Sequence, residues 1–346
     1  MARITFIFRL IRIFLPHWLA RIFTGNREIY RGAEIDVKAA AVGRLGNQVR
    51  GNGPMPGVAE SRVQMAKMAG QLDRKAPEIV RIEDFAVTGG DGPVMARLYS
   101  NHRDKTTPRP AMVYFHGGGF VQGDLETHNE LCAKLAKWWG GVVIAVDYRL
   151  APEHPYPAGA DDCTAAYLDI VSRAAELGLD AANIGVGGDS AGGCFAAVTA
   201  QQLRNANQQI PRFQLLIYPV TDGHINSESV NELADAYVLP KNRMVWYRDM
   251  YAGAFSDFDA PKFSPLLADD FSGLPESYII TGGFDPLVDD GAEYAKMLQT
   301  AGVPTVHRHF EGQVHGFVNL TKVIPDGTVA LREMAAWLKS VCKPER

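Results

Sequence analysis

The chain has 346 residues, of which 47% are hydrophobic and 21% are charged, with a formal net charge of −4. These are ordinary values for a folded protein, and the length suits one large α/β domain or two small ones. A negative net charge argues against a nucleic-acid partner, because phosphate binding requires a basic surface. The charge is uneven, since residues 1–50 carry nine Arg/Lys and three Asp/Glu.

The first 23 residues mix apolar and basic side chains. Four arginines interrupt the apolar run, so it does not fit a membrane-spanning helix, and no cleavage site for a secretory signal follows it. Apolar residues at helical spacing predict an amphipathic helix that Pro16 kinks or ends. The stripe consists of Ile4, Phe8, Ile11 and Leu15. We expect this helix to pack on the protein's own surface, to contact a membrane peripherally, or to be removed as a targeting segment.

From about residue 80 onward, strand-like and helix-like segments alternate, which predicts a mostly parallel sheet with helices on both faces. The expected strands are 111–115, 141–147, 183–186, 213–220, 277–281 and 305–310. The expected helices are 127–139, 161–177, 192–207 and 289–301. We therefore predict a helical N-terminal extension and cap (1–75), a catalytic core in two parts (76–220 and 263–346), and a cap insertion (221–262).

The clearest chemical motif is Gly188-Asp-Ser190-Ala-Gly192, which matches G-x-S-x-G. A short strand precedes it and a helix follows, as a nucleophile elbow requires. Ser190 would stand at the start of that helix, whose positive end favours a developing oxyanion. The alternative is a serine that only caps the helix.

A glycine-rich loop, His116-Gly-Gly-Gly119, follows the strand that ends at residue 115. Successive glycines let backbone N–H groups approach a substrate oxygen closely. We expect the N–H groups of Gly117 and Gly118, together with that of Ala191, to form an oxyanion hole. A simple glycine turn would explain the loop alone but not its pairing with a serine elbow.

Chain order selects the partners of the serine, because this architecture runs serine, acid, histidine. His315 lies in a turn just beyond the last strand, and Asp285 ends the strand before it. A buried Asp285 would hold the imidazole of His315 in the required tautomer. The other histidines that follow Ser190 lie within a strand or before the cap insertion, which favours structural positions. These are His224, His307 and His309.

Taken together, these motifs resemble the hormone-sensitive-lipase family of esterases, over about residues 80–340. The matching segments are His116–Phe120, Tyr148–Glu153, Gly188–Gly193, Ser264–Leu267, Asp285–Leu287 and His315–Phe317. The resemblance implies an α/β-hydrolase fold with an eight-stranded sheet and a helical cap. It also implies activity on short- to medium-chain esters without a cofactor. The chain departs from the family at Gly283, where relatives often carry an acidic residue or alanine.

The resemblance extends to the cap, where Tyr237-Val-Leu239 and Met244-Val-Trp246 are similar to family patterns. We expect Phe120, Tyr237, Trp246 and Tyr251 to contact the substrate. Packing of the cap aromatics onto the body of the protein is the alternative.

The expected function is that of a serine carboxylesterase that works through an acyl-enzyme. The alternatives are a non-catalytic small-ligand-binding module on the same fold, an amidase or a lactonase. The four cysteines lack metal-binding spacing, so we expect no metal, no cofactor and a cytoplasmic location. The sequence leaves open whether the chain forms a homodimer.

Overall fold

The computed structural model describes residues 13–22, 28–50 and 55–342. Eight strands form one sheet, in which β4 runs antiparallel to both neighbours and the other pairings are parallel. The predicted eight-stranded, mostly parallel sheet is confirmed. In spatial order the strands are β10 (Thr305–Val314), β9 (Glu276–Phe284), β8 (Phe213–Ile217), β7 (Leu179–Asp189), β5 (Arg109–Phe115), β6 (Val142–Asp147), β4 (Gly92–Ser100) and β3 (Arg81–Gly89).

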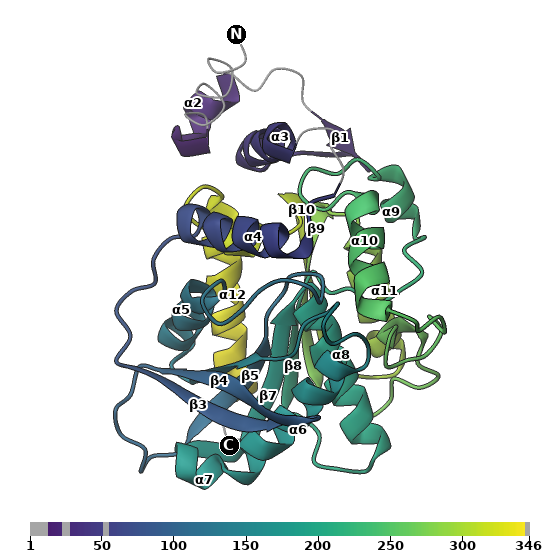
Figure 1. Ribbon diagram of the computed structural model, residues 1–346. Coiled ribbons are helices and arrows are strands. Elements are labelled where there is room, and N and C mark those ends of the chain that lie inside the picture. The colour runs from purple at the N-terminus through teal and green to yellow at the C-terminus, as the bar shows by residue number, and fades with distance from the viewer. Residues whose placement is uncertain (1–12, 23–27, 51–54, 343–346) are drawn as a thin grey trace.

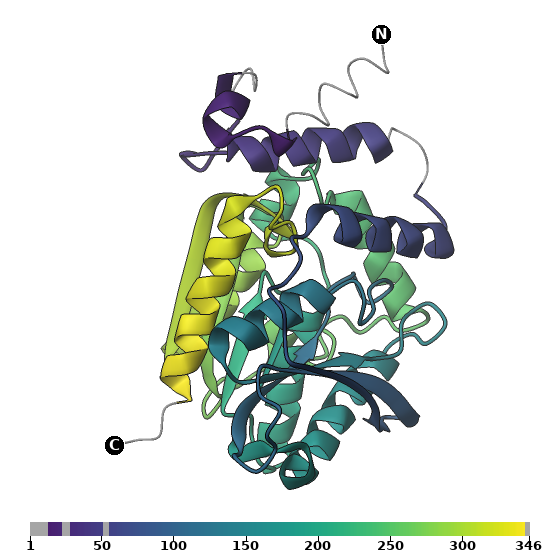
Figure 2. The same cartoon turned by 90° about the vertical axis from the view of Figure 1, so that its left-hand side faces the viewer.

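Helices cover both faces of this sheet (Figure 1). One side carries α5 and α12, and the other carries α6, α8 and α11 (Figures 1 and 2). A short antiparallel hairpin, β1–β2, precedes the main sheet. The bounds are β1 (Ile29–Tyr30), β2 (Ala33–Glu34), α2 (His17–Ile22), α3 (Val37–Arg50), α4 (Val58–Leu72), α5 (Asn129–Trp139), α6 (Ala158–Ser172), α7 (Ala174–Leu177), α8 (Ala191–Asn205), α9 (Glu228–Glu232), α10 (Lys241–Ala252), η1 (Pro265–Leu267), α11 (Val288–Thr300), η2 (Phe317–Asn319) and α12 (Pro325–Val341).

Successive residues of the central strands enter two separate hydrophobic cores. Val113 and Phe115 of β5 pack with buried residues of α6 and α8, whereas Met112 and Tyr114 pack with those of α5 and α12. A strand buried on both faces needs apolar residues at every position. This explains why β6 reads as the continuous apolar run Val-Val-Ile-Ala-Val.

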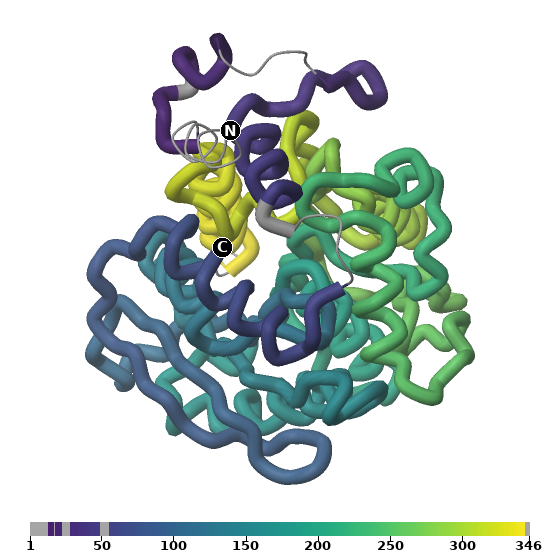
Figure 3. Tube along the Cα trace, turned by 45° about the horizontal axis from the view of Figure 1, so that its top comes forward, coloured from purple at the N-terminus to yellow at the C-terminus, as the bar shows by residue number. Residues whose placement is uncertain are grey.

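The carboxyl ends of the parallel strands are roofed by segments from two distant parts of the chain. Helix α4 reaches the loop after β5, where Arg62 Nε donates to Val121 O at 2.8 Å. Helix α10 reaches the same loop, where Tyr247 OH donates to Gln122 Oε1 at 2.9 Å. Figure 3 looks toward this end and shows the N-terminal helices beside the green insertion. The roof therefore lies above the edge of the sheet where a ligand site is expected.

The described part of the N-terminal extension packs on the body. Ile13 and Ala20 are buried, and Lys38 Nζ donates to the carbonyl oxygens of Ile13 and Leu15. Phe14, Trp18 and Ile22 are exposed. Most of the predicted amphipathic stripe falls in residues 1–12, outside the described residues. Within the described ranges, no helix is long and apolar enough to cross a bilayer.

Candidate active site

Ser190 occupies the sharp turn between β7 and α8. Its backbone has φ 55° and ψ −117°, a conformation that a side-chain-bearing residue rarely adopts. Two flanking glycines make the turn possible. A Cβ on Gly188 would lie 2.3 Å from the carbonyl carbon of Gly192, and a Cβ on Gly192 would lie 1.9 Å from Phe115 O. Strained turns of this kind occur where a nucleophile must be held exposed at the start of a helix.

Ser190, His315 and Asp285 form a continuous hydrogen-bonded chain. His315 Nε2 is 3.0 Å from Ser190 Oγ, and His315 Nδ1 is 2.7 Å from Asp285 Oδ2. Asp285 is fully buried, and its other oxygen accepts the N–H of Leu287 at 2.9 Å. The carboxylate requires a proton on Nδ1, which leaves the lone pair of Nε2 directed at the serine hydroxyl. This arrangement suits removal of the serine proton.

The other histidines that follow Ser190 have partners elsewhere. His307 Nε2 and His309 Nδ1 each lie 2.9 Å from Thr281 Oγ1. His224 bonds its neighbour Asp222, with Nδ1 2.7 Å from Oδ1. Their contacts fit the structural positions expected from the sequence.

The glycine-rich loop requires a correction to the predicted oxyanion hole. The N–H of Gly117 already donates to Asp189 Oδ1 at 2.9 Å, so it is not available to a substrate oxygen. The next two residues, Gly118 and Gly119, have φ of 129° and 61°, and the loop turns sharply at this point. A Cβ on Gly119 would lie 2.3 Å from the ring of Tyr247, which explains the absence of a side chain there. The candidate donors are therefore Gly118, Gly119 and Ala191.

The structure also corrects the prediction that Tyr237 and Tyr251 of the cap contact the substrate. Tyr237 packs against Gly43 of α3, and its hydroxyl bonds Glu28 and Arg44, so it joins the insertion to the N-terminal extension. Tyr251 is buried in the core between two aromatic rings. Its ring centroid lies 4.0 Å from that of Phe120 and 5.2 Å from that of Phe263. Substrate contact by Phe120 and Trp246 stays a prediction.

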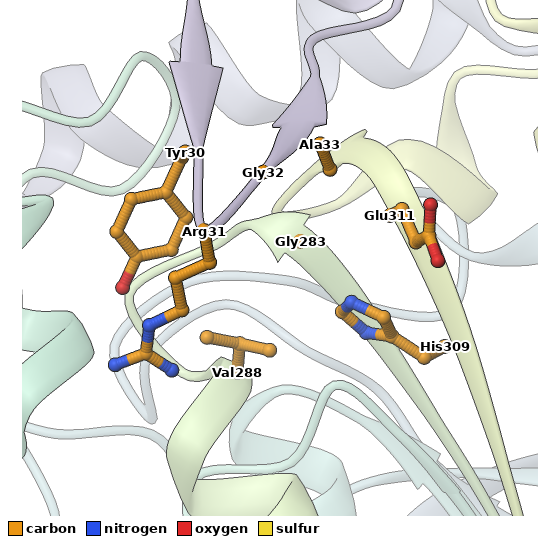
Figure 4. Close-up of a pocket in the computed structure, with 8 residues that line it drawn as sticks. All are labelled: Tyr30, Arg31, Gly32, Ala33, Gly283, Val288, His309 and Glu311. Atoms are coloured by element: carbon orange, nitrogen blue, oxygen red, sulfur yellow. The ribbon is translucent and has the colours of Figure 1, made fainter.

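A separate pocket lies between the β1–β2 hairpin, the ends of β9 and β10, and the start of α11 (Figure 4). Arg31 enters it and is 2.6 Å from Asp289 and 3.2 Å from Glu232, so its charge is compensated. Gly283 forms part of the wall, and a Cβ there would lie 1.9 Å from Glu311 O. The departure from the family pattern at Gly283 thus reflects a close approach of β10 to β9.

The fold and the site together define a class of protein. A serine on a strained strand–helix turn is hydrogen-bonded to a histidine and a buried aspartate at the carboxyl edge of a mostly parallel sheet. This is the arrangement of a serine hydrolase of the α/β-hydrolase fold.

Comparisons with known proteins agree with this class. The family model described as alpha/beta hydrolase fold matches residues 112–319. Esterase LipI of Mycobacterium tuberculosis is 40% identical over 259 residues, which cover 73% of this chain and 80% of LipI. The ethyl acetate hydrolase of Pseudomonas putida is 36% identical over 275 residues, which cover 79% of this chain and 86% of that enzyme. The solved structure of the carboxylesterase EstE1, cloned from a metagenomic library, has a TM-score of 0.80 at 37% identity and covers 84% of this chain and 99% of EstE1.

The chain belongs to the alpha/beta hydrolase fold family and, within it, to the hormone-sensitive-lipase family of esterases. It is a carboxylic-ester hydrolase. These relatives do not favour the alternatives of a non-catalytic binding module, an amidase or a lactonase.

Proposed function

We propose that Ser190 is the nucleophile, His315 the general base and Asp285 the residue that orients it. The observation that carries this proposal is the hydrogen-bonded chain from Ser190 Oγ through His315 to the buried carboxylate. His315 takes the serine proton as Oγ attacks the ester carbonyl, and then gives that proton to the leaving alcohol. Water, deprotonated by His315, attacks the resulting acyl-enzyme and releases the acid and Ser190.

The oxyanion of each tetrahedral intermediate would be held by the N–H groups of Gly118, Gly119 and Ala191. Ala191 is the first residue of α8, so its amide adds to the positive end of that helix. Gly118 and Gly119 follow directly after Gly117, whose amide is bound to Asp189. Fixed donors of this kind are typically worth about 10²–10³ in rate each.

We propose that the substrates are esters with acyl chains of about four to eight carbons. Helices α4 and α10 both form hydrogen bonds to the loop after β5, through Arg62 and Tyr247. A roof that is held down in this way supports an upper limit on the length of the acyl chain. The relative named ethyl acetate hydrolase also acts on a short ester. The family resemblance further implies that esters of tertiary alcohols are accepted.

Rapid mixing with p-nitrophenyl butyrate tests the mechanism. We expect a burst of p-nitrophenol equal to the enzyme concentration, and a butyryl adduct on Ser190 in the acid-quenched protein by peptide mass spectrometry. An adduct on another residue, or hydrolysis without any adduct on Ser190, would contradict it. A panel of acyl esters, with an amide and a lactone included, tests the substrate class. A preference for triolein over a butyrate ester would contradict the proposed acyl length.

We also propose that the N-terminal extension contacts a membrane peripherally. Phe14, Trp18 and Ile22 are 52%, 67% and 67% exposed, and the surrounding sequence is basic. Aromatic and apolar side chains next to basic ones suit the interface of an anionic bilayer. The division into core and caps and the cytoplasmic location stay predictions, and a homodimer stays one of the possible states of the chain.

A further inference from the structure

Asp189, the residue before the nucleophile, is buried and surrounded by donors. Its Oδ1 accepts Tyr114 OH at 2.7 Å and the Gly117 N–H at 2.9 Å. Its Oδ2 accepts Asn319 Nδ2 at 3.0 Å and lies 3.3 Å from His128 Nε2. The carboxylate therefore links the elbow, the glycine loop and His128.

The hydrogen-bond partners around His128 can accept a hydrogen bond from each of its ring nitrogens. Thr127 Oγ1 has one proton, which it donates to Asp124 O at 2.9 Å. The same oxygen lies 3.0 Å from His128 Nδ1 and, with its own proton directed at Asp124 O, it can accept a hydrogen bond from Nδ1. Nε2 faces the carboxylate of Asp189, which can accept a hydrogen bond as well. These contacts fit an imidazolium at His128 that is buried in an ion pair with Asp189.

The charged and titratable groups around His128 agree with this assignment. Burial opposes its charge, but Asp189, with smaller contributions from Asp124 and Asp73, outweighs burial and raises the pKa of His128. Burial likewise opposes ionisation of Asp189, yet His128, Tyr114 and the Gly117 amide lower its pKa to about 2. The ring of His116 lies 5.5 Å away, and burial followed by the charge of His128 lowers its pKa to about 4, so His116 is neutral. Cys132 and Tyr114 also face this site, and burial raises the pKa of each, so both are uncharged.

We propose that the buried His128–Asp189 pair positions the oxyanion loop and cancels a negative charge next to the place where the oxyanion forms. Asp189 holds the amide of Gly117, which sets the direction of the Gly118 and Gly119 amides that follow. Without the imidazolium, an uncompensated carboxylate adjacent to Ser190 would repel the oxyanion in a site of low dielectric constant. This inference rests on the proposed function, and His128 is a positioning residue within it.

The first test is His128→Gln, with the exposed His154→Gln as the matched control. We expect His128→Gln to lower kcat by about 10²-fold with KM close to wild type, because the ground state binds without an oxyanion. His154→Gln should keep wild-type kcat. Burst amplitude counts the competent sites in each sample, and the Ser190 adduct in wild type tests the proposed function separately. A folded His128→Gln variant with wild-type kcat would overturn the inference.

The second test removes the charge on both sides. Asp189→Asn keeps an oxygen to accept the Gly117 N–H and leaves no carboxylate to neutralise. The double variant His128→Gln/Asp189→Asn should therefore recover most of the kcat lost in the single histidine variant, which a purely structural role of His128 does not predict. If His128→Gln alone fails to fold, the double variant decides: a folded double variant that keeps most of the wild-type kcat supports the inference, and a loss of about 10²-fold overturns it.

The pH profile gives an independent readout. The charge of His128 is present below its raised pKa and lost above it, so wild-type kcat should fall on the alkaline side as the imidazolium deprotonates. The Asp189→Asn variant has no carboxylate to expose and should lack this alkaline fall. An alkaline fall that is the same in both proteins would overturn the inference.

Discussion

At the scale of single residues, the triad should behave as one unit. Ser190→Ala and His315→Ala should each lower kcat for p-nitrophenyl butyrate by about 10⁴-fold or more, because loss of either interrupts the same proton transfer. The double variant should lose little further activity. The control is His309→Gln, which changes a histidine bonded to Thr281 and should leave kcat near wild type. Ser190→Ala with about a tenth of wild-type turnover would contradict the mechanism.

Tyr251 provides a second test at this scale. Its hydroxyl is buried, and no residue in the described part of the chain hydrogen-bonds to it. Tyr251→Phe removes an unsatisfied polar group while keeping the ring stack, so the free energy of unfolding should stay level or rise by about 1 kcal/mol. The matched control is Tyr114→Phe, which loses a 2.7 Å bond to Asp189 and should be destabilised. Denaturant unfolding measures both, and a changed KM in Tyr251→Phe would indicate substrate contact instead.

At the scale of secondary-structure elements, the parallel pairing of β9 with β10 brings the proposed acid and base together. The register between these strands shifts between Phe310 and Val314, immediately before His315. Gly283 lies where the backbones come closest, since its missing Cβ would meet Glu311 O. The glycine therefore permits the bulge that brings His315 over Asp285.

Gly283→Ala tests this role. The added methyl group can be accommodated only if a strand moves, so we expect a loss of about 1–3 kcal/mol in stability together with reduced kcat. The matched control is Gly46→Ala in α3, where a Cβ meets open space. That helical substitution should leave stability level or raise it by up to about 1 kcal/mol. The melting temperature and kcat of both variants are measured. If Gly283→Ala keeps both at wild-type values, the strands do not need this close approach.

At the scale of the whole molecule, we expect the N-terminal extension to stabilise the fold and to contact a membrane. A chain that begins at residue 27 loses the buried side chains of Ile13 and Ala20 and removes both acceptors of Lys38. Lys38 is only 5% exposed in the intact chain and would exchange these carbonyls for water, so the main loss is the burial of the apolar side chains. We expect a clearly lower melting temperature for the truncated chain, and an unchanged melt would show that the extension adds no stability.

Co-sedimentation with vesicles rich in phosphatidylglycerol measures the membrane contact separately. The variant Phe14→Ser/Trp18→Ser/Ile22→Ser changes only exposed side chains, so it should keep its melting temperature and lose vesicle binding. Val63→Ser, which changes an exposed apolar residue of α4, is the control and should bind as wild type does. If the full-length protein does not sediment with the vesicles, the membrane proposal is wrong.

The sequence by itself predicts the residues proposed for catalysis, because their assignment depends on local motifs and chain order. Ser190 follows from its elbow, and Asp285 and His315 follow from their places after the last two strands. Five strands are predicted from apolar runs, because central parallel strands are buried on both faces, and residues 305–310 are predicted from their alternation, because β10 lies at the edge of the sheet and is only partly buried. The hairpin of β3 and β4 is not predicted, since several of its residues are exposed and its pattern is weaker.

Only the tertiary structure decided which polar groups meet across distant parts of the chain. The amide of Gly117 is bound by Asp189, 72 residues later, and this contact moves the predicted oxyanion donors to Gly118 and Gly119. His128 carries no motif of its own, and its charge follows from contacts with Thr127 and with Asp189, 61 residues away. Hydrogen bonds act only over short distances in space, so a sequence pattern can name a donor but cannot show whether its acceptor is substrate or protein.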